Sequence, residues 1–146
     1  MALFTSKVDY ALRALLDLAE QSPEKPAQSR EIAARQQIPE SYLHQLLVVL
    51  RRAGLVRSVR GASGGYVLGR EARQVTAADV VTALHGPDFL GDLPETDGGA
   101  PTASAIQRLH ARLSQAVQTE LQRTTLEDLA QEARRLDESR WLMFGL

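Results

Sequence analysis

The chain of 146 residues contains no cysteine. This absence excludes disulfide bonds, thiol redox sensing, thiolate-bound zinc and iron-sulfur clusters with cysteine ligands. The sequence also lacks an apolar run long enough to cross a bilayer, and its first residues lack the apolar stretch of a signal peptide. We therefore expect a cytoplasmic protein with no membrane partner, built as one domain or as a small domain with an oligomerisation arm.

The chain also has almost no net charge, at -1. Its positive and negative residues are nevertheless unevenly distributed along the sequence. Residues 1–75 contain 11 Lys and Arg against 7 Asp and Glu, whereas residues 76–146 contain 6 against 11. A nucleic-acid partner requires local positive charge and not a high overall pI. The first half is therefore the candidate for contact with DNA.

Apolar residues recur at helical spacing in three stretches of this basic half. The pattern predicts a scaffold helix over residues 7–20 with Ser6 as its cap, and a short second helix that Ser29 caps. Pro39 then favours the start of a third helix over residues 40–53. Two short helices separated by a turn are typical of a helix-turn-helix, whose second helix enters the DNA major groove.

The third predicted helix has two different faces. Its packing face carries four leucines at the 3.6-residue period, at positions 43, 46, 47 and 50. The other face carries Ser41, His44, Gln45 and Val48. Short polar side chains at the N-terminal end of such a helix can reach base edges, although an ordinary solvated helix face has the same pattern.

Two β-prone segments follow at residues 55–59 and 66–68, and they predict a hairpin. The tip between them is rich in glycine, which permits positive φ and close backbone approach to a groove. Arg57 and Arg60, with Arg51 upstream, supply charge for phosphate contacts or for minor-groove insertion. A nucleotide-binding phosphate loop does not fit, because neither a Lys-Ser/Thr pair nor a helix follows the glycines.

We therefore expect a mainly α fold with a small β-hairpin wing, that is, a winged helix-turn-helix domain followed by a long dimerisation helix. The expected divisions are residues 1–85 for the winged helix-turn-helix, 86–103 for an acidic sensor-like loop, and 104–146 for the dimerisation helix, C-terminal helix and tail. An apolar stripe after a Gly/Pro-rich loop needs a partner surface, which is either a second copy or the chain's own core. The stripe consists of Ile106, Leu109, Leu113, Val117 and Leu121.

The C-terminal residues predict a further helix with an apolar end. A capping box of Thr124 with Glu127, or of Thr125 with Asp128, starts this helix, which we expect to pack on the core. The tail at 141–146 is apolar, and chain ends are usually polar unless they dock, so we expect it to dock. The favoured role is packing on the dimerisation helix of its own or the partner chain, and the alternative is a lid over an effector surface.

Several segments resemble the Rrf-type family of bacterial regulators, which includes IscR, NsrR and CymR. They lie at residues 6–7, 10–19, 32–33, 42–43, 45–46, 53–56, 58–61, 64–66, 75–76, 79–81, 124–126 and 128–129. The resemblance implies a homodimeric transcription factor on a pseudo-palindromic operator, with the second helix of the motif in the major groove and the wing in the adjacent groove. The residues expected to contact DNA are Ser6, Lys7, Ser41, Tyr42, His44, Gln45, Arg51, Arg57, Arg60, Gly61, Ser63, Gly64, Gly65 and Tyr66.

Two departures change what this resemblance implies. The iron-sulfur regulator of the family places a Glu where this chain has His44, so its operator preference does not transfer. Cluster-binding members carry three cysteines in the loop corresponding to residues 86–102, where this chain has none. Nitrogen and oxygen ligands for a metal are present in this region at His85, Asp88, Asp92, Glu95 and Asp97. Their spacing favours an acidic solvated loop, so we expect neither a metal nor a cofactor.

The leading hypothesis is a sequence-specific DNA-binding regulator, expected to be a repressor, that works as a homodimer without a cysteine-ligated iron-sulfur cluster. The alternative is a winged-helix regulator controlled mainly by a partner protein. A small-molecule or protein effector is expected to act between the acidic loop, the dimerisation helix and the tail. An enzyme is the least favoured class, because no nucleophile, acid–base pair or metal motif is present.

Overall fold

The computed structural model of the chain describes residues 3–22, 24–91 and 99–145. In chain order the elements are α1 (Ser6–Glu20), α2 (Ser29–Gln36), α3 (Glu40–Arg52), β1 (Val56–Val59), β2 (Gly65–Leu68), the short 3-10 helix η1 (Ala72–Gln74), α4 (Ala77–His85), α5 (Pro101–Arg123) and α6 (Leu126–Phe144). The two strands form an antiparallel hairpin, so the expected mainly α fold with a β wing is confirmed. Across the described ranges, no helix is long and apolar enough to span a membrane.

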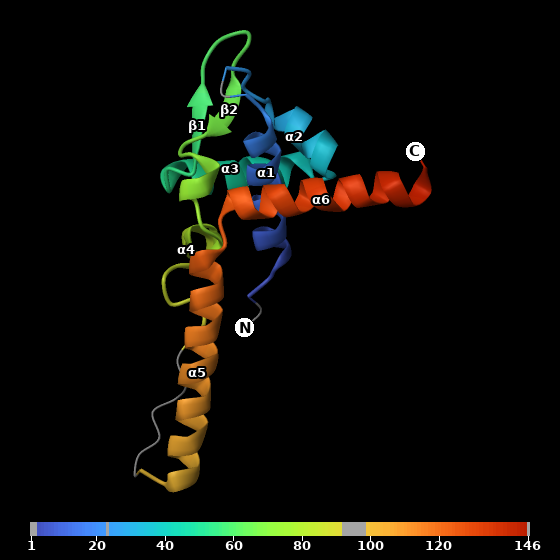
Figure 1. The fold of residues 1–146 in the computed structure, drawn as a ribbon. Coiled ribbons are helices and arrows are strands. Elements are labelled where there is room, and N and C mark those ends of the chain that lie inside the picture. Colours follow the sequence, from blue (N-terminus) through green and yellow to red (C-terminus); the bar gives the residue numbers. More distant parts are fainter. Residues whose placement is uncertain (1–2, 23, 92–98, 146) are drawn as a thin grey trace.

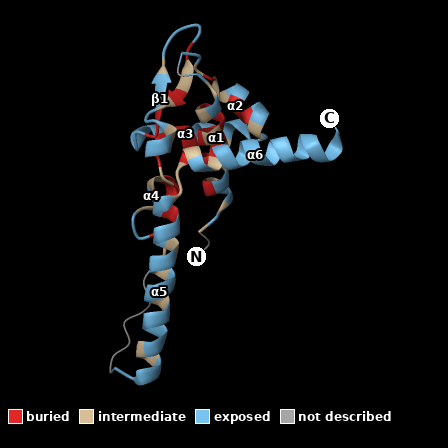
Figure 2. Cartoon of the chain, viewed as in Figure 1, coloured by how far each residue is buried: buried red, intermediate tan, exposed pale blue. Residues whose placement is uncertain are grey.

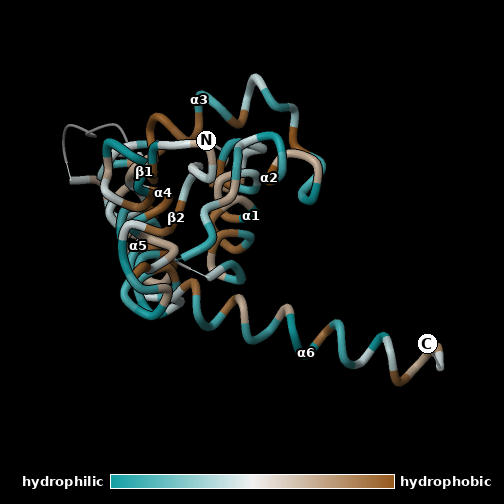
Figure 3. The backbone as a smooth tube through the Cα atoms, turned by 90° about the horizontal axis from the view of Figure 1, so that it is seen from above, coloured by the Kyte–Doolittle hydropathy of each residue, from teal (hydrophilic) through white to brown (hydrophobic). Residues whose placement is uncertain are grey.

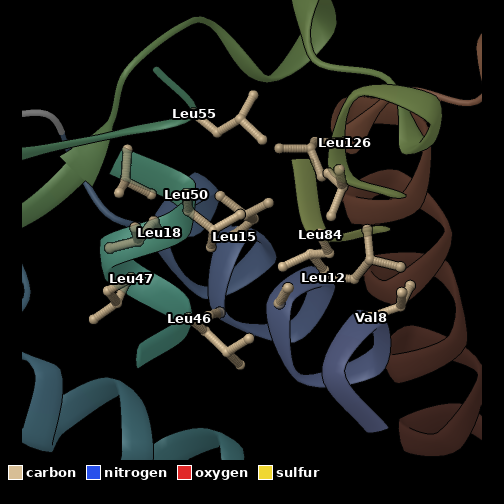
Figure 4. Close-up of a cluster of buried hydrophobic side chains, with 14 of the residues drawn as sticks. Val8, Leu12, Leu15, Leu18, Leu46, Leu47, Leu50, Leu55, Leu84 and Leu126 are labelled. Carbon is tan, nitrogen blue, oxygen red and sulfur yellow. The ribbon is translucent and has the colours of Figure 1, made fainter. Parts of the chain in front are cut away.

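The hydrophobic core is built around α1. This helix contacts α2, α3, α4, α6 and β2 (Figure 1). Its apolar side chains meet the leucines of α3, and Leu15, Leu47 and Leu50 are completely buried in the cluster shown in Figure 4. The leucine face predicted for residues 40–53 is therefore the packing face of α3, which fixes the direction of its opposite face.

Two helices begin one residue earlier than the sequence patterns suggest. We expected Ser6 and Ser29 as caps, but Thr5 is the N-cap of α1, where its hydroxyl accepts from the backbone N–H of Val8. Gln28 is the N-cap of α2, and its backbone N–H donates to the Glu31 carboxylate at 3.4 Å. A cap needs extended backbone angles before the helix, and Ser6 and Ser29 already lie inside it.

At the start of α6, the structure selects one of the two candidate capping boxes. Thr125 Oγ1 accepts from the backbone N–H of Asp128 at 3.1 Å, and Asp128 Oδ2 accepts from the backbone N–H of Thr125 at 2.9 Å. Hydrogen bonding to the carboxylate, first from the backbone N–H of Thr125 and second from its side chain, holds the pKa of Asp128 below its usual value because it favours the ionised form. The alternative box of Thr124 with Glu127 is not the one formed, since the cap of α6 is Thr125.

Helices α5 and α6 leave the body in different directions and are largely exposed (Figures 1 and 2). The first part of α6 packs on the core through Leu126 and Ala130, as expected. The expected core packing does not extend along the whole helix, because Leu136 is 61% exposed. The apolar residues 141–144 continue α6 beyond the body, where they are exposed rather than docked on the chain's own α5 (Figure 3).

A buried ion pair joins α1 to α2. Asp17 is 5% exposed, and both of its carboxylate oxygens accept hydrogen bonds from Arg35, at 2.9 and 2.8 Å. The side-chain amide of Gln36 donates to the same carboxylate at 3.1 Å. The hydrogen bond to Asp17 raises the pKa of Arg35, and the fork geometry fixes the position of α2 against α1.

We expect Asp17→Ala to lower the free energy of unfolding by about 2–3 kcal/mol, because a bidentate charged contact is lost while Arg35 can still reach water. Asp9→Ala is the matched control, since Asp9 pairs with Arg13 on the exposed side of the same helix. Its cost should stay below about 1 kcal/mol. Urea unfolding followed by circular dichroism measures the free energy of unfolding of both variants. Equal losses would contradict a special contribution of the Asp17–Arg35 pair to stability.

Candidate nucleic-acid interface

The free face of α3 carries the polar residues that were expected there. Ser41, His44 and Gln45 are exposed, whereas the four leucines of the opposite face are buried. Because α3 is held through that leucine face, the free face cannot turn inward without opening the core. It presents hydroxyl, imidazole and amide groups, all able to donate or accept hydrogen bonds.

His44 is connected to the start of α2. Its Nε2 lies 3.2 Å from Ser29 Oγ and 3.9 Å from Glu40 Oε1. The first turn of α2 therefore borders the free face of α3, with the half-buried Ser29 against His44 and the exposed Arg30 next to it in sequence. We did not single out Ser29 or Arg30 as interface residues, because only the angle between the two helices brings them to this face.

Three other expected contact residues are placed less directly. Tyr42 is half-buried and meets the ring of Tyr10 edge-on, with 5.7 Å between ring centroids, so its ring packs α3 against α1. Lys7 Nζ donates to the carbonyl oxygen of Leu84 at 3.3 Å, at the C-terminal end of α4. Ser6 is exposed at the start of the same α1, at the end of the body away from the hairpin (Figure 1).

The wing is fixed to the body by its backbone. Val56 pairs with Leu68 and Val59 with Gly65 in the hairpin register. The backbone N–H of Tyr66 donates to the carbonyl oxygen of Ala27 at 2.7 Å, and that of Ala27 donates back at 3.0 Å. The segment before α2 thus pairs with β2 through a single β-bridge between Ala27 and Tyr66.

Two of the wing glycines are required by space. A Cβ on Gly65 would lie 2.4 Å from the carbonyl oxygen of Ala27, and one on Gly64 would lie 2.2 Å from that of Val59. Gly64 is also buried and Gly65 half-buried, so both residues are needed for the shape of the wing. Gly61 and Ser63 lie at the exposed tip, where a Cβ on Gly61 would meet nothing.

Unpaired arginines lie on α3 and the hairpin. Arg51, Arg57 and Arg60 are exposed, and none of them forms an ion pair with any residue that the structure describes. Arg30, Arg52, Arg108, Arg112, Arg135 and Arg140 also lack an ion pair among the described residues, whereas an acid lies within ion-pair distance of Arg13, Arg35, Arg70, Arg73, Arg123 and Arg134. The end of α3 and the first strand of the wing therefore carry positive charge that no neighbouring carboxylate neutralises, as a phosphate-binding surface requires.

The apolar stripe of α5 divides between two surroundings. Leu121 is buried in the chain's own core, and Val117 packs against that core. Ile106, Leu109 and Leu113 are 57%, 47% and 58% exposed. The stripe therefore contributes its C-terminal end to the body, and its first three members form an apolar surface on the projecting part of the helix.

The structure describes only two of the five candidate metal ligands in and beside the acidic loop. His85 Nε2 lies 3.4 Å from Thr5 Oγ1, and Asp88 is exposed. Asp92, Glu95 and Asp97 lie outside the described residues. Among the residues that are described, no three His, Asp or Glu side chains are grouped as a metal site would need.

The comparisons with known proteins identify the family. The sequence profile of the Rrf2 proteins, described as iron-dependent transcriptional regulators, matches residues 4–132. The chain belongs to the Rrf2 family. CymR of Bacillus subtilis is 40% identical over 126 residues, covering 86% of this chain and 88% of CymR. IscR of Xenorhabdus nematophila is 50% identical over 80 residues, covering 55% and 49% of the two chains.

Solved structures of the family confirm the winged-helix fold. The structure of CymR, the global cysteine regulator of B. subtilis, has a TM-score of 0.75 at 38% identity and covers 90% of this chain and 98% of its own. T. potens IscR has a TM-score of 0.71 at 35% identity, covering 89% and 87%. The chain is thus a transcriptional regulator, and its kinship confirms that it is not an enzyme.

A cysteine-ligated iron-sulfur cluster does not fit this member of an iron-dependent family. The chain contains no cysteine at any position, so thiolates are missing from the donor set. Iron-sulfur clusters are held by cysteine thiolates, with histidine replacing only some of them in particular types. The fold and the regulatory class of the family therefore apply to this chain, but a cysteine-ligated iron-sulfur cluster does not.

We expect Gly65→Ala to lower the free energy of unfolding by about 1–3 kcal/mol, because the added Cβ overlaps the carbonyl oxygen of Ala27 and pushes the wing off the segment before α2. Gly61→Ala is the control, since it places alanine at a positive φ as Gly65→Ala does, but its Cβ meets nothing within 4 Å. Amide hydrogen exchange of Ala27 and Tyr66 should accelerate only in Gly65→Ala. Equal exchange in the two variants would contradict the spatial requirement at Gly65.

Proposed function

We propose that the chain binds a pseudo-palindromic operator as a homodimer, represses transcription there and works without a cysteine-ligated iron-sulfur cluster. In this proposal α3 enters the major groove, and the hairpin wing meets the adjacent groove. The observation that supports it is the combination of a free polar face on α3 with unpaired arginines at the end of α3 and on the wing. Neither feature is needed for the stability of the body.

Each part of this surface has a separate role in the proposal. Ser41, His44 and Gln45 read base edges, because short donors and acceptors on a groove-bound helix determine sequence preference. Arg51, Arg57 and Arg60 bind phosphates or enter the minor groove, which anchors the protein without specifying sequence. Tyr42 acts through its packing on Tyr10, which orients the first turn of α3.

Homodimer formation is supported by the exposed part of the α5 stripe. Ile106, Leu109 and Leu113 lie on one side of a helix that projects from the body, and exposed apolar side chains in such a row typically mark an interface. A two-fold dimer would present two copies of α3 to two half-sites, which is what a pseudo-palindromic operator requires.

A second candidate is control by a partner protein. The observation that favours it is the far end of α6, where Trp141, Leu142, Met143 and Phe144 are all more than half exposed. Aromatic residues and methionine are enriched at protein interfaces, and this segment extends beyond the chain's own core. Removal of residues 141–146 distinguishes a partner-binding role of this segment from a role in the dimer. If the shortened chain no longer captures a regulatory protein but still forms the dimer, control by a partner protein is favoured.

We expect Arg60→Ala to weaken operator binding by about 1–3 kcal/mol and to reduce the salt dependence by roughly one phosphate contact. The operator is first selected from random duplexes with the wild-type protein, and affinities are then measured by fluorescence anisotropy at several salt concentrations. Arg134→Ala is the control, because this arginine lies on α6 and pairs with Glu127. Unchanged affinity in Arg60→Ala would remove the wing from the mechanism.

We expect Leu109→Asp to convert the dimer into monomers, because a charge at the centre of the exposed stripe is costly to bury. Gln107→Asp introduces the same charge on α5 outside the stripe and should leave the dimer intact. Sedimentation velocity measures both masses, and operator selection reports whether two half-sites are still required. A dimeric Leu109→Asp variant with normal operator binding would place the interface elsewhere.

A further inference from the structure

A cavity of about 540 Å³ lies between the end of α1, strand β2 and η1. Its volume falls in the range of small-molecule sites. The apolar part of its lining comes from Leu18, Ala19, Leu68 and Ala72. The DNA-facing arginines Arg51, Arg57 and Arg60 are not among its lining residues, so the cavity is separate from the proposed phosphate contacts.

One guanidinium on the lining has unused hydrogen-bonding capacity. Arg70 lies 3.6 Å from the nearest oxygen of Asp79, which is too long for a hydrogen bond. That Asp79 oxygen already accepts from the backbone N–H of Thr76 at 2.9 Å. Among the described residues, Arg70 donates no side-chain hydrogen bond, and its planar fork of donors matches a carboxylate.

The other charges around the cavity favour an anion only at the Arg70 end. Glu71 also lines the cavity, but Arg73 pairs with it at 2.6 Å and balances its charge. The opposite end is the C-terminus of α1, where backbone carbonyls carry partial negative charge and the last turn has no basic residue. Asp79 at 3.6 Å partly offsets the charge of Arg70 but forms no hydrogen bond with it, so an anionic head would compete with Asp79 for the free donors of Arg70, and the apolar body lies toward Leu18 and Ala19.

We propose that this cavity binds a small molecule with an apolar body and one carboxylate, which Arg70 holds. The site also adjoins the backbone that fixes the wing, since Tyr66 lines the cavity and forms the bridge to Ala27. Occupancy of the cavity consequently alters the placement of the hairpin on α1. This regulatory part rests on the proposed operator binding, whereas ligand binding itself does not.

The test uses the full chain without DNA and calorimetric titration with 3-phenylpropanoate and octanoate. The matched probes 3-phenylpropan-1-ol and 3-phenylpropylamine have the same apolar body without the carboxylate. We expect the carboxylates to bind at least about tenfold more tightly than these probes, because one charged hydrogen-bonded contact is worth that factor. No binding at millimolar concentration, or equal binding of the alcohol, would overturn the proposal.

Variants locate the binding. Arg70→Gln should remove the preference for the carboxylate, whereas Arg30→Gln, which deletes an exposed positive charge that neither lines the cavity nor pairs with a residue that does, should retain it. Ala19→Phe fills the cavity and should abolish binding of every probe. Amide shifts of the wild-type protein provide a readout independent of variant folding, and shifts remote from Ala19 and Leu68 would overturn the site.

The regulatory part is measured separately on the selected operator. Saturating 3-phenylpropanoate should change the operator Kd of the wild-type protein by about fivefold or more and leave that of Arg70→Gln unchanged. Unaltered operator affinity with normal ligand binding would overturn the coupling to the wing. Failure to bind any operator, with ligand binding intact, would instead contradict the proposed function and not the cavity.

Discussion

The burial of α1 is the constraint on which the other elements depend. Four helices and the second strand of the wing pack on this one helix, so its apolar side chains fix all of them at once. The ion pair from Asp17 to Arg35 adds a direction to this non-directional packing, because a bidentate contact sets the position of α2 along α1. The leucine face of α3 then leaves only the opposite face free.

The wing is placed by backbone contacts rather than by side-chain packing. A two-stranded hairpin is marginal by itself, and this one gains a third partner when Ala27 pairs with Tyr66. The close approach at Gly65 leaves no space for a side chain, so the identity of that residue and the position of the wing are linked. The same contact joins the wing to the segment before α2, and Tyr66 also lines the cavity beside α1, so a ligand in the cavity would lie next to this contact.

The single chain buries only some of the apolar residues of its two C-terminal helices. Leu121, Leu126 and Ala130 complete the core, whereas Ile106, Leu109 and Leu113 on α5 and the end of α6 are exposed. Apolar surface in continuous rows is costly in water, and the proposed dimer and partner contacts would cover it. The family relationship gives the fold and the regulatory class, and the lack of cysteine separates this member from control by a cysteine-ligated cluster.

Periodicity and composition predicted the helices, the hairpin, the buried face of α3 and the exclusion of thiolate ligands, because local spacing and residue chemistry determine these features. They failed where two local solutions are similar in energy, as at the caps Thr5 and Gln28 beside Ser6 and Ser29. They also could not tell that Leu121 is buried and Leu109 exposed. Both leucines belong to the same apolar stripe, and the helical spacing is the same whether a residue faces the chain's own core or solvent. Only the tertiary structure decided which stripe residues enter the core, the contact of Ser29 with His44 and the bridge of Ala27 to Tyr66, because each of these depends on segments apart in sequence meeting in space.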